Sequence, residues 1–401
     1  MIHPILWAAL ASGGLAQLYK VVVESLRERR FKLYRFFETG GMPSSHTAVV
    51  TALAVGAWRE AGFDSALFAI TGVFSVYFIL EATGLRQEVG KQAGVLNEIL
   101  DELIDSRHFA REKTRAIAEI QETDTKPDTI AAKRFAAAIY PGHPYGLTPT
   151  AQSVGSIARE DVAAFHRDHY GAKRAVVSIV GDVTRAEAEA IAQRLTDALP
   201  AGVPDAGLPA VTQPSERIVR ISHPASQSHI HVGLPAIKRG DPDFFALQAG
   251  NYSLGGGGFV SRLMKEVREK RGYAYSVYSY FSARRLEGPF EIGLQTKREQ
   301  ADAALKVANG VLADFLAKGP TEQELAAAKK HLIDSLALSI DSNAKLINFV
   351  SIIGYFDLPL TWLDDYPAKM QAVTAADVRA AFKRHVAPRH LVTVIVATDE
   401  K

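Results

Sequence analysis

The stretch AADVRAAFKRHVAPRHLVTVIV, residues 375–396, has a counterpart 216 positions earlier, REDVAAFHRDHYGAKRAVVSIV, residues 159–180. The two align without a gap, and their matched pairs include Asp161 with Asp377, His169 with His385, Val176 with Val392, and Ile179 with Ile395. Apolar residues at helical spacing come first in each copy, and a β-branched run follows a short turn. The repeat therefore predicts two related halves, each ending with a helix, a turn and a buried strand.

The rest of the second half has the pattern of an α+β domain. Strands are predicted at Arg217–Ser222 and His229–Leu234, where apolar residues alternate, and also at Ala274–Ser282, Phe290–Gln295 and Leu391–Ala397. Helical spacing predicts helices at Asp243–Tyr252 and Phe259–Lys270, and three or four more over Gln300–His385.

The first half can be followed only from about residue 106 onward. Helical spacing predicts helices at Ile130–Ile139, Arg159–His169 and Thr184–Leu199, the last with Thr184 as its N-cap. The β-branched run Arg174–Val180 predicts a buried strand.

The N-terminal segment does not match the start of the second half. The offset of the repeat places residue 1 opposite Arg217, where strands begin, but the segment instead contains three apolar runs, Pro4–Tyr19, Thr47–Ala57 and Ser65–Leu80. Each run is shorter than the ~18–20 charge-free residues of a confident membrane span. Their clustering nevertheless predicts an all-α, membrane-associated domain.

We therefore predict four segments. These are a helical domain at 1–105, a remnant of the first half at 106–200, a proline-rich linker at 201–216 and a complete second half at 217–401. Because the remnant has lost its partner strands, we expect it to pack poorly.

Composition excludes some classes of site and partner. The hydrophobic content of 47% is typical of a chain that buries a core, and the net charge of +2 gives no reason to expect nucleic-acid binding. The chain has no cysteine, so disulfides and thiolate metal sites are excluded.

The most informative motif lies between residues 254 and 275. Four glycines, Gly255, Gly256, Gly257 and Gly258, give a backbone that can approach a ligand closely. Arg268 and Tyr275 flank a helix end at Gly272, which places a guanidinium and a phenol beside one strand edge. Such a pair suits the binding of peptide carbonyls and the stabilisation of a developing oxyanion.

This motif, with Asp241-Pro-Asp243, Asn251 and Ser261-Arg262-Leu263, resembles the C-terminal half of the pitrilysin/insulinase family of zinc peptidases. Tyr140-Pro-Gly-His-Pro-Tyr-Gly146 and Val180-Gly-Asp182 resemble the later part of that family's first half. The resemblance covers about three-quarters of the chain and implies duplicated pitrilysin-type halves, the first truncated. It also implies that Arg268 and Tyr275 assist substrate binding and the transition state.

The family's zinc motif, H-x-x-E-H, is absent from the sequence. In the family two histidines hold zinc, the glutamate activates water, and a later glutamate is the third ligand. Glu119 matches only that third position, so we interpret it as a solvated helix residue. His166 with His169, and His229 with His231, each share a face but have no third ligand at a recognisable spacing. His143 is interpreted as a turn residue.

The N-terminal segment resembles a second family, the divergent phosphatidic acid phosphatase or haloperoxidase-related membrane proteins. The resemblance rests on Thr39-Gly-Gly-Met-Pro-Ser-Ser-His46, Gly84-Leu-Arg86 and Gly90-Lys-Gln-Ala-Gly-Val-Leu-Asn97. Ser44, Ser45, His46 and Arg86 are the candidate phosphate-binding residues. The second histidine of the parent phosphatases, in a Ser-Arg-x5-His-x3-Asp string, is missing.

These observations predict a peptidase-like protein that is inactive alone, needs no cofactor itself, and complements a zinc-bearing subunit in a heterodimer acting on peptides. Residues 1–105 would attach it to a bacterial inner membrane. The alternative is a membrane phosphatase-like protein acting through Ser44 to His46, and a third possibility is an interaction module without either activity.

Overall fold

The computed structural model describes residues 11, 12, 14–19, 51, 52, 55, 59, 106–197 and 199–397. The chain divides into two compact units, residues 1–103 and 104–401. All the described residues of the first unit are helical.

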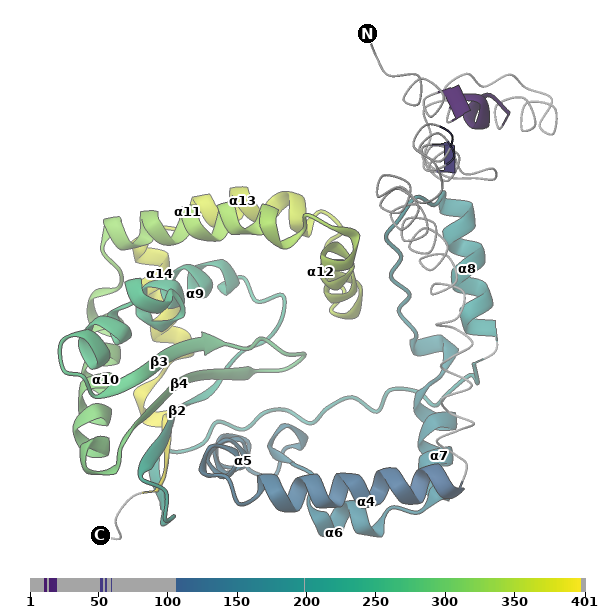
Figure 1. Ribbon diagram of the computed structural model, residues 1–401. Helices are drawn as coiled ribbons and strands as arrows, with labels where there is room; N and C mark the ends of the chain where they lie inside the picture. Colours follow the sequence, from purple (N-terminus) through teal and green to yellow (C-terminus); the bar gives the residue numbers. More distant parts are fainter. Residues whose placement is uncertain are drawn as a thin grey trace. The chain divides into compact units, whose positions relative to one another are not determined.

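The second half is built on a mixed five-stranded sheet of strand order β1-β5-β2-β4-β3 (Figure 1). Its strands are β1 (Arg217–Ile221), β2 (Gln227–Ile237), β3 (Ala274–Phe281), β4 (Gly288–Lys297) and β5 (Val392–Val396). All five strands predicted for this half are confirmed. β5 lies inside the sheet, parallel to β1 and antiparallel to β2.

The described part of the second half contains six α-helices, three of which pack directly on one face of this sheet. They are α9 (Phe244–Asn251), α10 (Ala301–Lys318), α11 (Glu322–Ser339), α12 (Asn343–Tyr355), α13 (Trp362–Ala372) and α14 (Ala375–His385). The region after residue 300 thus holds five helices, so the expectation of three or four was too low. One of the extra breaks falls between α12 and α13, at Asp357 (φ 52°) and Pro359, where proline cannot continue a helix.

The two faces of β5 belong to different apolar cores, as the period of two of a strand requires. Ile395 joins the large core under α9, α10 and α14. Val392, Val394 and Val396 instead pack against Phe135 of helix α5 (Pro127–Ile139), which lies on the opposite face of the sheet.

The first half contributes further helices: α4 (Ser106–Thr123), α6 (Ala151–Ser156), α7 (Arg159–His169) and α8 (Arg185–Asp197). Thr184 is the N-cap of α8, as predicted, and the Glu187 side chain accepts a hydrogen bond from the Thr184 N–H in return. The repeat is visible in the structure: α7 and α14 lie at corresponding positions, and each is followed by a short 3₁₀ turn, at Ala172–Arg174 and Pro388–His390.

The predicted strand at Arg174–Val180 is wrong. Arg174 ends the 3₁₀ turn, and residues 175–180 have no regular structure. Val176 is 53% exposed, whereas the corresponding Val392 in β5 is fully buried. β5 is a strand because β1 and β2 pair with it. The positions matching β2 in the first half include residues 14–19, which are helical, so the β-branched run has propensity without a partner strand.

The expectation that the remnant packs poorly holds for one part and fails for another. Helices α6, α7 and α8 contain no buried residue. By contrast, α5 and the turn after it are anchored to the second half: the Tyr140 hydroxyl donates to the Glu287 carbonyl at 2.9 Å, and Arg217 donates to the Ala138 carbonyl at 2.7 Å. His143 is a buried turn residue whose Nε2 lies 3.0 Å from the Pro209 carbonyl.

Most of the apolar N-terminal runs lie outside the described residues. Among the residues that are described, no single helix is long and apolar enough to cross a membrane. The pair α11 and α12 is together long and apolar enough for a membrane span, but the two helices are bent by 113° relative to each other.

Candidate functional site

Arg268 and Tyr275 meet because the chain reverses between them. Arg268 lies on a π-helical segment, Met264–Glu269, and Tyr275 lies at the start of β3. Gly272 adopts φ 64°, a conformation that side chains rarely tolerate. Its N–H donates to the Arg268 carbonyl at 2.8 Å, and the next N–H donates to the Val267 carbonyl at 3.0 Å, which closes the helix end.

Two aromatic rings, those of Tyr275 and Phe259, lie close to the Arg268 guanidinium. Its central carbon lies 4.8 Å from the centre of the Tyr275 ring and 4.7 Å from that of Phe259. Tyr275 is 84% exposed and Phe259 63% exposed, so both rings present most of their surface to solvent. Cation–π contacts of this kind hold a guanidinium in place without using its N–H donors.

A β-bulge sets the direction of Tyr275. Ala274 pairs with Thr296 and Val277 pairs with Leu294, so two residues of β3, Tyr275 and Ser276, stand opposite one residue of β4. Such a bulge bends the strand and re-aims its side chains. Because β3 is an edge strand of the sheet, Tyr275 projects beside an edge that has no neighbouring strand among the described residues.

The side-chain donors of this group are available to a ligand. Neither the Arg268 guanidinium nor the Tyr275 hydroxyl has a hydrogen-bond or ion-pair partner within the described part of the chain. A planar guanidinium with free N–H groups can donate to carbonyl or carboxylate oxygens, and a phenol can donate to a developing oxyanion. Arg268 and Tyr275 are hydrogen-bond donors, so together they can bind a ligand and stabilise a developing negative charge.

Packing requires three of the four loop glycines. A Cβ at Gly255 would lie 2.4 Å from Ser279 Oγ, one at Gly256 would lie 2.5 Å from Asn251 Nδ2, and one at Gly257 would lie 2.6 Å from a carbonyl oxygen. Asn251 and Ser279 exchange two buried hydrogen bonds, which tie the end of α9 to β3. Only Gly258, with φ 59°, faces open space. Contact of this loop with a ligand stays a prediction.

The residues that were considered and rejected as zinc ligands lie apart in the described structure. Glu119 is exposed on α4 and belongs to no metal-type group among the described residues. His166 and His169 lie on α7, each beside an aromatic ring. These residues do not fit a catalytic zinc ion, which takes three protein ligands.

His229 and His231 share a face of β2, as predicted from their spacing. His231 Nδ1 lies 2.7 Å from Oε1 of Glu291. The Tyr280 hydroxyl donates to the other carboxylate oxygen of Glu291 at 2.6 Å. Burial lowers the pKa of His229. The pair therefore belongs to the sheet face under α5.

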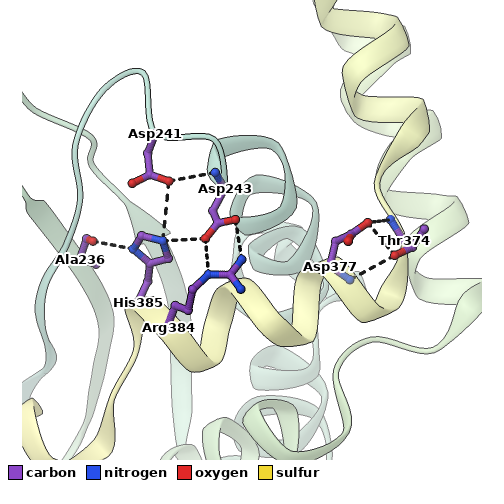
Figure 2. A network of polar contacts seen from close by, with 7 residues as sticks. All are labelled: Ala236, Asp241, Asp243, Thr374, Asp377, Arg384 and His385. Carbon is purple, nitrogen blue, oxygen red and sulfur yellow. Dashed lines mark hydrogen bonds and ion pairs between the residues drawn. The ribbon is translucent and has the colours of Figure 1, made fainter.

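The structure reveals a polar group that the sequence analysis missed, formed by Asp241, Asp243 and His385 (Figure 2). His385 Nδ1 lies 2.8 Å from the Ala236 carbonyl, and its Nε2 lies 2.9 Å from an Asp243 oxygen. Arg384 donates to both oxygens of Asp243, and these hydrogen bonds hold the pKa of that carboxyl below its usual value although burial opposes the shift. With both ring nitrogens facing oxygen atoms, the group is an ion-pair network, poorly suited to a metal.

Phe259 is the second feature that the sequence analysis missed. The sequence feature that could have indicated it is an aromatic residue directly after four glycines. Ser44, Ser45, His46 and Arg86 lie outside the described residues.

Two protein families match the chain. The family described as the peptidase M16 inactive domain matches residues 156–332, and the divergent PAP2 family matches residues 1–126. The second match extends past both the predicted boundary at 105 and the division of the structure after residue 103, and it includes helix α4.

The similar proteins also fall into two groups, zinc proteases and a membrane protein. An uncharacterised zinc protease of Streptomyces coelicolor is 28% identical over 77% of this chain and 69% of its own length. One from Mycobacterium tuberculosis is 31% identical over 58% of this chain, which spans about half (54%) of that protein. The uncharacterised membrane protein YuiD of Bacillus subtilis is 41% identical over 27% of this chain and 66% of its own length.

A solved structure agrees with these matches. The crystal structure of a peptidase M16 inactive domain from Pseudomonas fluorescens superposes with a TM-score of 0.71 and 36% identity. The superposition covers 74% of this chain and 71% of that one. Both resemblances expected from the sequence motifs are thereby confirmed.

Proposed function

The chain belongs to the peptidase M16 inactive-domain family, and from that premise we propose that it binds peptide for a separate zinc-bearing subunit and cleaves nothing alone. The observation that carries the proposal is the Arg268–Tyr275 pair, whose donors have no partner among the described residues and project beside an edge strand. A peptide lying along β3 would present its carbonyl oxygens to these donors.

The chain lacks the means to act alone. The sequence contains no H-x-x-E-H string, and Glu119 is the single residue at a zinc-ligand position. One exposed carboxylate cannot hold a catalytic zinc ion. In the complex, Arg268 would hold the substrate and Tyr275 would donate a hydrogen bond to the oxygen that gains charge in the transition state.

The first half offers a place for the missing partner. Residues 176–180 occupy the position of a strand that, in the second half, is paired on both sides. None of their backbone groups is hydrogen-bonded within the described residues. A subunit that brings strands together with the zinc helix would satisfy these groups and supply the metal site in one event.

The test is to mix the purified chain with an H-x-x-E-H subunit of the same family and follow cleavage of a fluorogenic peptide. We expect the mixture to be active, each protein alone to be inactive, and Tyr275→Phe to lower kcat by about 10²-fold or more, as loss of an oxyanion donor does. Tyr252→Phe is the matched control, since Tyr252 is half-buried beside His331. Cleavage that is absent from the mixture, or unchanged by Tyr275→Phe, would overturn the proposal.

We further propose that residues 1–105 attach the protein to a bacterial inner membrane. The support is their match to the divergent PAP2 family and to a Bacillus subtilis membrane protein. Membrane fractionation of the full chain, and of a variant without residues 1–103, tests this directly: the full chain should sediment with membranes. A phosphate-release assay with His46→Ala as control tests the alternative phosphatase-like function.

A further inference from the structure

A cavity lies at the opposite end of helix α9 from the glycine loop. Its volume is 580 Å³, and it is lined by the loop before α9, the first turn of α9 and residues of α13 and α14. At about 1.5 Å per residue, the eight residues of α9 separate it from the Asn251 end by about 12 Å. The cavity is therefore distinct from the Arg268–Tyr275 site.

Arg239 is the unusual group in this cavity. Its guanidinium lies near two phenylalanine rings, 5.5 Å from the centre of Phe244 and 5.1 Å from that of Phe356. Its Nε is buried and has no hydrogen-bond partner, and no carboxylate of the described residues lies within ion-pair distance of it. Burial lowers its pKa, because the charged form loses water. A half-buried guanidinium without an anion is energetically unfavourable.

The other charged side chains of the cavity wall already have polar partners. Asp243 accepts two hydrogen bonds from Arg384, and His385 lies within 2.9 Å of Asp243 and 3.7 Å of Asp241 (Figure 2). Elsewhere in the lining, Asp377 accepts hydrogen bonds from Thr374, and Lys369 pairs with Asp365. Arg239 is thus the one cation of the lining residues that lacks a polar partner.

An aromatic cluster forms part of the cavity wall. Phe244 and Phe245 contact each other edge to face, and Trp362 lies 6.2 Å from Phe244 and 6.3 Å from Phe245 between ring centres. Such a surface favours an apolar or aromatic group of a ligand.

We propose that this cavity binds a carboxylate that carries an apolar or aromatic body. The carboxylate would accept hydrogen bonds from Arg239, and the body would lie against Phe244, Phe245 and Trp362. A planar guanidinium matches the two oxygens of a carboxylate. A small aromatic acid and the free C-terminus of a peptide share this chemistry. The inference rests on the cavity alone and stands whether or not the chain serves a zinc-bearing subunit.

The test uses 3-phenylpropionate as the probe and its neutral amide as the matched ligand, with binding to the full chain measured by calorimetry. We expect the acid to bind at least about tenfold more tightly than the amide, which corresponds to about 1.4 kcal/mol. A peptide with a free C-terminal phenylalanine, compared with its amidated form, then distinguishes the two sources: binding of the free-acid peptide identifies a peptide C-terminus, and binding of the small acid alone identifies a metabolite-sized ligand.

Arg239→Met keeps the length of the side chain and removes its charge, so it should abolish the preference for the acid. Arg115→Met makes the same change on exposed α4, outside the cavity, and should leave binding unchanged. If Arg239→Met fails to fold, the affinities of the native chain for the acid and for the amide still test whether the cavity prefers a carboxylate. Equal affinity for acid and amide, or no binding of the acid at millimolar concentration, would overturn the proposal.

Discussion

The guanidinium of Arg268 lies 4.8 Å from the centre of the Tyr275 ring, although a helix end and a chain reversal separate the two residues. The centre of the Phe259 ring lies 4.7 Å from the same guanidinium. A π-helical segment, an edge strand and the end of a glycine-rich loop therefore converge on one cation. This convergence fixes the position of Arg268 while its donors remain available.

Gly255→Ala should destabilise the second half, because the added methyl would lie 2.4 Å from Ser279 Oγ and 2.8 Å from Leu263. Overpacking of this kind lowers the free energy of unfolding by about 1–3 kcal/mol. Gly310→Ala is the control: Gly310 lies within α10 with nothing near a built Cβ, so alanine should raise the free energy of unfolding by about 0.5–1 kcal/mol. Urea unfolding gives the free energy of unfolding of each variant. Equal changes in this free energy for Gly255→Ala and Gly310→Ala would contradict the packing argument.

The ion pair of Arg262 and Glu324 should make stability depend on pH in acid. Arg262 donates to both carboxylate oxygens, at 2.8 and 2.6 Å. Burial alone would raise the pKa of Glu324, but the hydrogen bonds from Arg262 and the Thr321 backbone lower it from 4.5 to about 2. The contribution of the pair is therefore complete above pH 4.5 and is lost as pH falls toward 2.

Glu324→Gln should consequently cost about 1–2 kcal/mol at pH 7, allowing for solvent screening, and progressively less below pH 4. Glu322→Gln, an exposed change in the first turn of the same helix, should have little effect at either pH. Unfolding by urea at several pH values is the measurement. A cost for Glu324→Gln that grows as the pH falls would reverse the expected sign.

Phe135→Ala should weaken the attachment of α5 to the sheet. Phe135 is buried against the valines of β5, and its ring stacks on His231 at 5.5 Å. Removing a buried phenylalanine side chain costs about 3–5 kcal/mol. Phe165→Ala, at an exposed site on α7, should cost less than about 1 kcal/mol. Similar losses for the two variants would contradict the division of the first half into a packed and an unpacked part.

Hydrogen exchange compares the two copies of the repeat within one molecule. Amides of residues 392–396 are held in β5 between two strands, whereas those of 176–180 have no backbone partner among the described residues. We expect 176–180 to exchange rapidly and 392–396 slowly. Adding an H-x-x-E-H subunit should slow exchange at 176–180. Slow exchange there in the chain alone would show that the strand is already paired.

All five strands of the second half could be predicted from local pattern, and so could most of its helices. The helix predicted at Phe259–Lys270 is an exception, because the extended backbone of Ser261 separates a 3₁₀ turn at Gly258–Val260 from the π-helical segment Met264–Glu269. The helix end at Gly272 and the meeting of Arg268 with Tyr275 also followed from sequence. The run at 174–180 could not be assigned from its own residues. Its β-branched residues set a propensity, but partner strands far away in the chain decide whether that propensity is realised.

Other parts of the site depend on contacts between distant segments. The contact of Phe259 with Arg268 requires the path of the glycine loop, and the bulge at Tyr275 requires the register of β3 against β4. The network of Asp243 with His385 joins residues 142 positions apart. The local sequence predicts none of these contacts, although an aromatic residue directly after four glycines is a signal for Phe259 itself.

Peptide binding in the absence of metal tests the central claim most directly. A fluorescent peptide is titrated with the chain, with and without EDTA, and the anisotropy gives Kd. The account predicts the same Kd in both conditions and at least about tenfold weaker binding for Arg268→Ala, a loss of about 1.4 kcal/mol. Binding that disappears with EDTA, or that is unaffected by Arg268→Ala, would contradict a metal-independent peptide site at Arg268 and Tyr275.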